Sequence, residues 1–151
     1  MSKKYTYRQI YENRLKAINY LMQPSRRKAT GELDSGKGRR CCLGHMSFAL
    51  GVKRTRLVKN GGAYGAEEAG TFAPKETQEM LGMYDDNGYA LDWTFLKIPS
   101  RPEITAYSLA DLNDGYNISP QSIGRYLLSV IMGGAKTPWK KIRIPVAERK
   151  H

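Results

Sequence analysis

The chain has 151 residues, the size of one ordinary domain, and carries a net charge of +11 with 40% hydrophobic residues. This composition excludes a chain that is disordered throughout, and apolar runs such as 126–132 reach only about a third of a membrane span. The N-terminal residues lack the apolar core of a secretion signal, so we expect a cytoplasmic protein with no membrane partner.

The first predicted element is an amphipathic helix over 7–23. Its apolar residues recur at helical spacing, Thr6 is placed to cap it, and Pro24 ends it. Residues 25–40 hold three glycines and six basic residues without an apolar period, which predicts a loop that no apolar residue holds to the core. A short, almost wholly apolar helix is expected over 41–51, with Phe48 among its buried residues.

The middle of the chain predicts shorter elements. Residues 52–58 alternate apolar and basic side chains, as a strand does, and the Asn-Gly-Gly turn at 60–62 would fold 63–66 back as a hairpin. Pro74 opens a second short helix, which Gly82 limits.

The last third contains a turn, a strand and two helical segments. The Asp-Asp-Asn-Gly sequence at 85–88 is a turn signal, and 89–98 has strand composition. A helical turn over 108–112 stops at Asn113-Asp114-Gly115. The final helix starts at Ser119, with a proline in its first turn, and ends at a glycine pair.

These elements predict an α+β fold of three to four short helices packed on a small antiparallel sheet. Residues 1–134 would form a single globular domain. Residues 135–151 are basic and interrupted by two prolines, which predicts a C-terminal arm with Trp139 and Ile142 as anchors.

Four features in this order resemble a widespread group of small bacteriophage proteins with a "CCLG … LND" pattern. They are Cys41-Cys42-Leu43-Gly44, then Leu81-Gly82-Met83, then the Leu109–Asp114 segment LADLND, and a final amphipathic helix over 118–132. The resemblance spans about residues 7–132 and leaves out His45 and the tail. It implies a phage origin and the cytoplasm of an infected bacterium, and it implies no particular chemistry.

The two adjacent cysteines raise the question of a nucleophile. Cys41 at a helix start, beside Arg39 and Arg40, would have a lowered thiol pKa because cations and the helix dipole stabilise a thiolate. Nucleophilic catalysis also needs a base, and His45 is poorly placed on the same helix. We therefore predict that Cys41 and Cys42 are free thiols buried as small hydrophobes, and we expect no enzyme.

No convincing ligand set for a metal or cofactor emerges. Cys41, Cys42, His45 and Asp114 form an unusual combination for zinc, and 85–96 lacks the glutamate of a calcium loop. Asn113 and Asp114 would either orient a ligand or, as we favour, form a turn. We expect no metal and no cofactor.

Charge is the strongest global feature. Residues 1–60 have a net charge of +12, residues 61–134 of −6 and residues 135–151 of +5. Basic ends around an acidic middle indicate either a polyanion partner or a charge-matched fold.

The leading hypothesis is a small phage accessory protein that binds nucleic acid or a host complex that handles it, for host takeover or defence evasion. Alternatives are a virion or assembly component that contacts DNA, and a binder of a phosphate-containing small ligand. The oligomeric state stays open. The predicted contact residues are Arg26, Arg27, Lys28, Arg39, Arg40, Lys53, Arg54, Arg56, Lys59, Lys140, Lys141 and Arg143. Charge reversal at Arg39, Arg40, Arg54 and Arg56 should abolish binding and leave the fold intact.

Overall fold

The computed structural model of the chain describes most of the residues between 5 and 132. The described ranges are 5–29, 33–36, 38–53, 73–90, 93–94, 96–98, 101–106 and 108–132. The predicted C-terminal arm and all but the first two residues of the predicted 52–66 hairpin lie outside these ranges.

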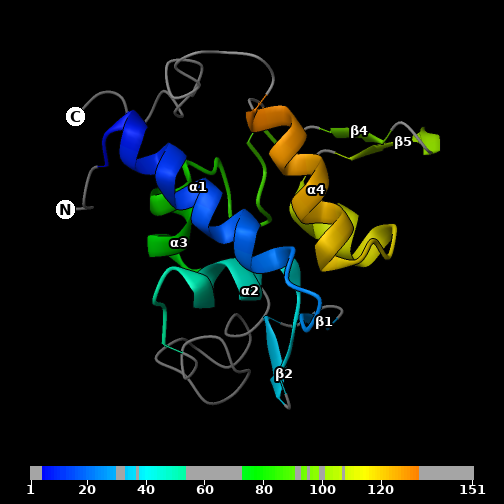
Figure 1. Cartoon of the computed structure of the whole chain (residues 1–151), viewed down its shortest axis with the longest axis horizontal. Coiled ribbons are helices and arrows are strands. Elements are labelled where there is room, and N and C mark those ends of the chain that lie inside the picture. The colour runs from blue at the N-terminus through cyan, green and yellow to red at the C-terminus, as the bar shows by residue number, and fades with distance from the viewer. Residues whose placement is uncertain are drawn as a thin grey trace.

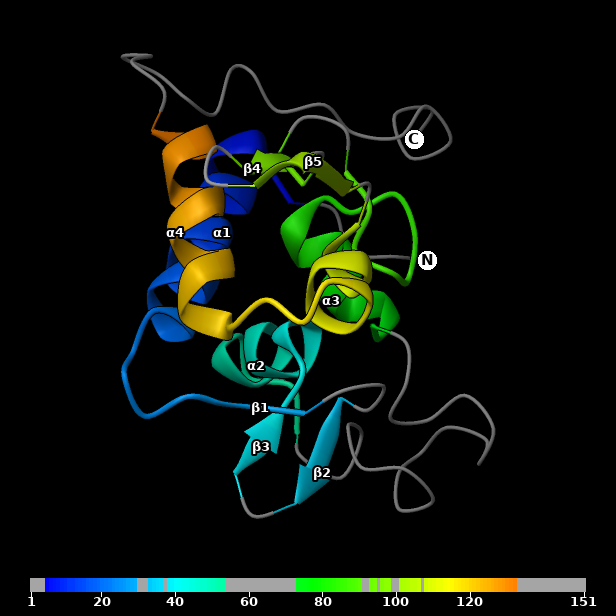
Figure 2. The same ribbon diagram turned by 90° about the vertical axis from the view of Figure 1, so that its right-hand side faces the viewer.

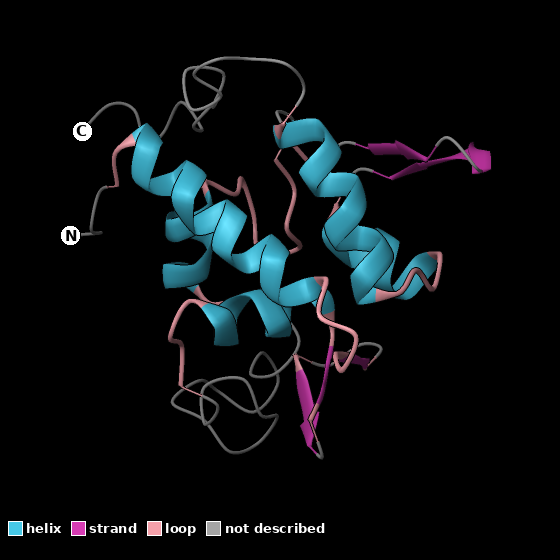
Figure 3. Ribbon diagram, viewed as in Figure 1, coloured by secondary structure: helices cyan, strands magenta, loops and turns pink. Residues whose placement is uncertain are grey.

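Helices make up most of the described body (Figure 3), with short strands at two ends. In chain order the elements are α1 (Tyr7–Leu21), β1 (Arg27–Lys28), β2 (Asp34–Gly36), β3 (Arg39–Arg40), α2 (Cys42–Ala49), α3 (Lys75–Leu81), β4 (Leu96–Ile98), β5 (Arg101–Ala106), the π-helical turn η2 (Asp111–Gly115) and α4 (Pro120–Ile131). The α+β class predicted from the sequence is confirmed.

Helix α1 begins at the predicted residue and ends at Leu21, two residues before the predicted end at 23. The Thr6 hydroxyl accepts a hydrogen bond from the Gln9 amide, and the Gln9 side chain accepts one from the Thr6 amide, which together form a capping box. The buried face includes Ile10, Ile18 and Leu21, and packs against α2, α3 and α4 (Figure 1). Helix α1 is therefore the central element around which the other helices gather.

Helix α4 also follows its sequence signals. The Ser119 hydroxyl accepts from the Ser122 amide, and Pro120 occupies the first turn, where its missing N–H costs nothing. Ile123 and Leu127 are fully buried against α1. Gly124 allows the close approach, because a Cβ atom there would lie 2.6 Å from the Met22 side chain.

The three-stranded sheet lies beyond α2, at the opposite end of the molecule from β4 and β5 (Figure 2). Its strand order is β1-β3-β2, with β1 parallel and β2 antiparallel to β3. The sheet is thus mixed, whereas the sequence predicted an antiparallel sheet. The difference arises because β2 comes between β1 and β3 in the chain, so β3 pairs with β1 in the parallel direction. Strands β4 and β5 form a separate antiparallel pair.

The expected 25–40 loop is tied to the core, contrary to the prediction. Leu33 is fully buried and belongs to the same hydrophobic cluster as Leu21, Met46 and Trp93. Helix α2 approaches it so closely that a Cβ at Gly44 would collide with the Leu33 carbonyl oxygen. This contact explains why the buried helix needs glycine at this position.

Two further predictions change in detail. Among the described residues of the expected strand over 89–98, β4 alone is in strand conformation, because the Trp93 amide bonds the Ala90 carbonyl and forms a turn before it. The expected turn at Asn113 is the π-helical turn η2. Among the described residues, no helix combines the length and apolar composition that crossing a membrane requires.

Candidate functional site

The parallel pairing of β1 with β3 sorts four basic residues onto two faces. Arg27 lies opposite Arg39, and Lys28 lies opposite Arg40. Paired residues of neighbouring strands project to the same face, and successive residues project to opposite faces. Arg27 and Arg39 therefore leave the sheet side by side. Both are exposed, and neither has an acidic partner among the described residues.

The other face of β3 carries a buried ion pair. The Arg40 Nε donates to Asp34 Oδ2 at 3.0 Å, and Asp34 Oδ1 accepts from the Gly36 amide at 2.8 Å. Asp34 is 1% exposed and Arg40 is 8% exposed. Reversing the charge of Arg40 would put two carboxylates at a buried position. The prediction that the fold survives this change therefore does not hold for Arg40.

Two guanidinium groups pack on two neighbouring aromatic rings beside this sheet. The Cζ atom of Arg26 lies 3.6 Å from the centroid of the Tyr20 ring, and Cζ of Arg40 lies 4.0 Å from that of Phe48. The two rings are 6.1 Å apart at 48°. We call the region around β1 and β3 that contains Tyr20, Arg26, Arg27, Arg39, Arg40 and Phe48 the basic–aromatic surface. Arg27 and Arg39 lie on one face of β3, and Arg40, which packs on Phe48, lies on the other.

The His45 side chain links α2 to strand β1. Its Nε2 lies 2.7 Å from the Arg27 carbonyl oxygen, which can only accept, so Nε2 carries the proton. Burial, with a smaller effect of the Arg40 and Arg26 cations, lowers the pKa of His45 to about 4 against the opposing effect of the Arg27 carbonyl. Near pH 7 the ring is neutral, and its buried Nδ1 has no hydrogen-bond partner among the described residues. The role of His45 here is to position β1.

Asn113 is a second structural anchor of the same region. Its Oδ1 accepts from the Cys42 amide at 3.0 Å, and its Nδ2 donates to the Ala29 carbonyl at 2.9 Å and to Asp114 Oδ1 at 2.6 Å. Its own carbonyl accepts from Lys28 Nζ at 3.3 Å. Asn113 is 1% exposed, so it holds η2, α2 and the end of β1 together and does not face a ligand.

The two cysteines are buried free thiols, as predicted. The Cys41 sulfur accepts from the Gly44 amide at 3.4 Å and caps α2, and the Cys42 thiol donates to the Leu109 carbonyl at 3.4 Å. Burial raises the pKa of Cys41 to about 12 and raises that of Cys42 well above its usual value. Both are protonated at neutral pH, so neither is an activated thiolate.

The structure brings together only part of the predicted contact set. Lys53 is exposed just after α2. Lys28 is half-buried and directed to the Asn113 carbonyl. Six predicted residues lie outside the described ranges: Arg54, Arg56, Lys59, Lys140, Lys141 and Arg143.

Sequence reasoning missed both rings of the surface. Phe48 was expected in the buried helix but is 39% exposed, because it lies one residue before the C-terminal end of α2. Tyr20 is absent from the apolar positions of the 7–23 period. An aromatic residue off a helix's apolar face was the available signal for it.

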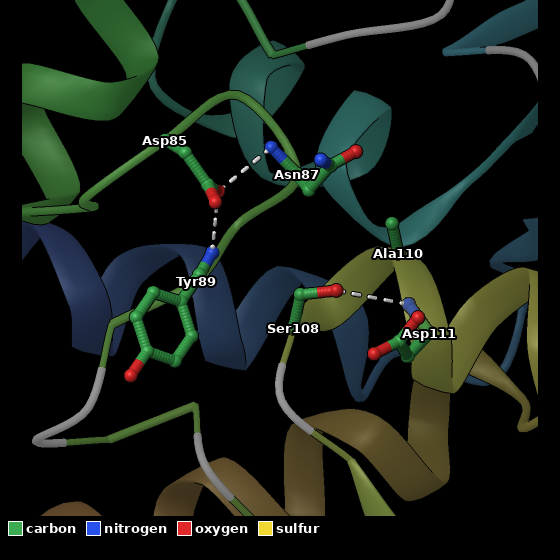
Figure 4. A pocket seen from close by; sticks show the side chains of 6 residues that line it. All are labelled: Asp85, Asn87, Tyr89, Ser108, Ala110 and Asp111. Carbon is green, nitrogen blue, oxygen red and sulfur yellow. Dashed lines mark hydrogen bonds between the residues drawn. The ribbon is translucent and has the colours of Figure 1, made fainter.

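A polar hollow of about 320 Å³ lies elsewhere, between the 85–89 turn and the start of η2 (Figure 4). Its polar groups serve their own turns. Asp85 Oδ1 accepts from the amides of Asn87 and Tyr89, both at 3.0 Å, and Ser108 Oγ accepts from the Asp111 amide. Across the part of the chain that the structure describes, no three His, Cys, Asp or Glu side chains gather as metal ligands.

Comparison of the chain with protein-family models, with curated proteins and with solved structures finds no match. The grounds for a function are therefore the charges and rings of the basic–aromatic surface.

Proposed function

We propose that this protein binds nucleic acid through the basic–aromatic surface. The observation that carries the proposal is the pair Arg27 and Arg39, which the β1–β3 register holds side by side without an acidic partner among the described residues. Like charges at neighbouring positions repel each other. A bound phosphate would relieve this repulsion and accept hydrogen bonds from both guanidinium groups.

The side chains of Arg26 and Arg40 differ from those of Arg27 and Arg39 because contacts within the protein already hold them in place. Arg26 donates to the Tyr20 carbonyl at 3.0 Å, and Arg40 is held by Asp34. Side chains that are already ordered lose little conformational entropy on binding. Arg27 and Arg39 thus differ from Arg26 and Arg40, whose guanidinium groups already have partners, in being exposed and without an acidic partner among the described residues.

The resemblance to small bacteriophage proteins gives this activity its proposed setting. There the protein would act as an accessory protein in the cytoplasm of an infected bacterium, on nucleic acid or on a host complex that contains it. The net charge of +12 in residues 1–60 supports a polyanion partner, because it raises the rate of encounter as well as the affinity.

The test is binding of labelled 20-mer oligonucleotides, followed by fluorescence anisotropy at several salt concentrations. The double variant Arg27→Glu/Arg39→Glu should bind about 100-fold more weakly, since each charged hydrogen bond to a phosphate contributes about 1.5 kcal/mol or more. The salt dependence should also weaken, by about 0.7 to 0.9 in log–log slope for each phosphate that the variant no longer binds.

The matched control is Arg8→Glu/Lys75→Glu, which changes the net charge equally at exposed positions on the first turn of α1 and at the start of α3. It should lose much less affinity than the Arg27/Arg39 variant. Equal losses in the two variants would mean that overall charge alone drives binding. Unchanged affinity in Arg27→Glu/Arg39→Glu, with the fold intact by circular dichroism, would refute the proposed surface.

A further inference from the structure

Arg27 and Arg39 occupy the exposed face of the three-stranded sheet. On the other face, Arg40 and Asp34 form a buried ion pair, and Lys28 donates to a backbone carbonyl. Arg27 and Arg39 alternate with Lys28 and Arg40 along β1 and β3, so they project to the opposite side. The carboxylate within the three strands, that of Asp34, is bonded to Arg40 and is therefore not the partner of either exposed arginine.

Glycines leave Arg39 uncovered on two sides. The residue of β2 that pairs with Arg39 is Gly36, which has no side chain to cover it. The preceding residue, Gly38, has open space among the described residues where a Cβ atom would stand. Both glycines have a positive φ, 89° and 76°, which disfavours any residue with a side chain there. A phosphate group can therefore reach Arg39 without displacing a side chain at either position.

A single phosphate group can contact both arginines. Neighbouring strands lie about 4.8 Å apart and Arg27 is paired with Arg39, so the two guanidinium groups can approach one anion from two sides. A phosphodiester within a strand carries one negative charge and two unbridged oxygens. A terminal phosphate carries a charge of about −1.5 to −2 near pH 7 and three acceptor oxygens. The terminal phosphate therefore matches the two positive charges and their donors better.

We infer that Arg27 and Arg39 bind the terminal phosphate of a nucleic-acid strand. This inference rests on the proposed function and names the part of the nucleic acid that the two arginines recognise. A strand is favoured over a free nucleotide because residues 1–60 carry a net charge of +12, which attracts the further phosphates of a polyanion. The contact does not depend on the terminal base, because Phe48 packs on Arg40, on the other face of β3.

The experiment measures binding of one 20-mer sequence that has an internal fluorescent label and hydroxyl ends, a 5′-phosphate or a 3′-phosphate. A hydroxyl-ended 22-mer is the charge-matched ligand, because two added phosphodiesters contribute about the same charge as one terminal phosphate. The native protein should bind each phosphorylated 20-mer at least about tenfold more tightly than the hydroxyl-ended 20-mer and 22-mer. Tenfold corresponds to about one charged hydrogen bond.

Two double variants locate the preference. Arg27→Gln/Arg39→Gln should bind all four oligonucleotides with nearly equal affinity. Its control, Lys16→Gln/Arg125→Gln, removes the same charge at exposed positions of α1 and α4 and should keep the native preference. If Arg27→Gln/Arg39→Gln fails to fold, each single variant should still reduce the preference.

Equal native affinity for phosphorylated and hydroxyl-ended strands would overturn the inference and leave the proposed function in place. A preference that survives in Arg27→Gln/Arg39→Gln would overturn it as well. Displacement of a phosphorylated 20-mer by an equimolar nucleoside 5′-monophosphate would identify a free nucleotide as the ligand and overturn the strand. Binding of none of the four oligonucleotides would overturn both the inference and the proposed function.

Discussion

Arginine occupies two very different environments in this molecule. In the helical body, Arg14 is 2% exposed, and its Nε and Nη2 atoms donate to the carbonyls of Leu81 and Gly82, at 2.8 and 3.3 Å. Its guanidinium carbon lies 4.4 Å from the Trp93 ring centroid. These carbonyls end α3, where the helix dipole is negative and the backbone lacks helical partners. Arg14 thus completes the fold.

The paired strands β1 and β3 use arginine in the opposite way. Arg27 and Arg39 are exposed and meet no described acidic group, although each is as strong a donor as Arg14. The comparison teaches that the number of basic residues in a segment does not measure its binding capacity. Arginine donors that already bond groups within the fold, as in Arg14 and Arg40, are not available to bind a ligand.

The largest effect is expected at the buried arginine. Arg14→Met keeps an apolar stem but leaves the last α3 carbonyls without donors in a dry site, so the free energy of unfolding should fall by about 4 kcal/mol. Urea unfolding of Arg14→Met and of the exposed control Arg8→Met measures it. A loss below about 1 kcal/mol would mean that Arg14 does not hold α3 to α1.

The next largest effect is expected at Asn113. Asn113→Ala removes the partner of the Cys42 amide and of the Ala29 carbonyl, both in the interior, and should cost about 3 kcal/mol. The exposed Asn19→Ala is the control and should change stability by less than about 0.5 kcal/mol. Because β1 ends at this anchor, Asn113→Ala should also weaken nucleic-acid binding. Stability loss without weaker binding would separate the anchor from the surface.

Acid should destabilise the protein through His45. Its folded pKa of about 4 lies below the usual 6.5, so the unfolded chain binds the proton first as the pH falls. The contribution of the neutral ring is complete above about pH 6.5 and is lost as the pH falls toward 4, by about 2 to 3 kcal/mol. Urea unfolding at about pH 7, 5.5 and 4.5 measures the slope.

The His45→Gln variant isolates this contribution. Glutamine can donate to the Arg27 carbonyl but does not titrate, so the difference between the two proteins cancels the carboxylates common to both. The native protein should lose more stability than His45→Gln between about pH 6.5 and 4.5. Parallel pH profiles would show that His45 is not the group responsible.

The helices and their ends could be predicted because their signals are local. Thr6, Ser119 and Gly82 act within one turn of the chain, and the apolar period of α1 needs no partner to be recognised. The same holds for the burial of Cys41 and Cys42, since the 41–51 segment is almost wholly apolar.

The site could not be predicted to the same extent, because it depends on pairings between distant residues. A parallel contact between two-residue strands puts Arg27 beside Arg39, and no pattern of period two exists over two residues. The burial of Arg40 depends on Asp34, and the exposure of Phe48 depends on where α2 ends against α1. Composition identified a basic segment but could not divide it into structural and free cations.

The smallest expected effect is at Arg27 and Arg39, and it separates the two kinds of arginine most clearly. Removing Arg14 should lower the free energy of unfolding, whereas removing these two charges should leave it unchanged or raise it. Arg27→Gln/Arg39→Gln removes two neighbouring like charges and no described ion pair, so the free energy of unfolding should stay unchanged or rise by about 0.5 kcal/mol. The gain should be largest at low salt and vanish near 1 M salt, where the Debye length falls to about 3 Å. Urea unfolding of this variant and the native protein at about 0.02 M and 1 M salt measures it. A fall of more than about 1 kcal/mol in the free energy of unfolding would mean that these two arginines, like Arg14, stabilise the fold. A stable variant that no longer binds oligonucleotides would show that β1 and β3 carry two charges for a ligand.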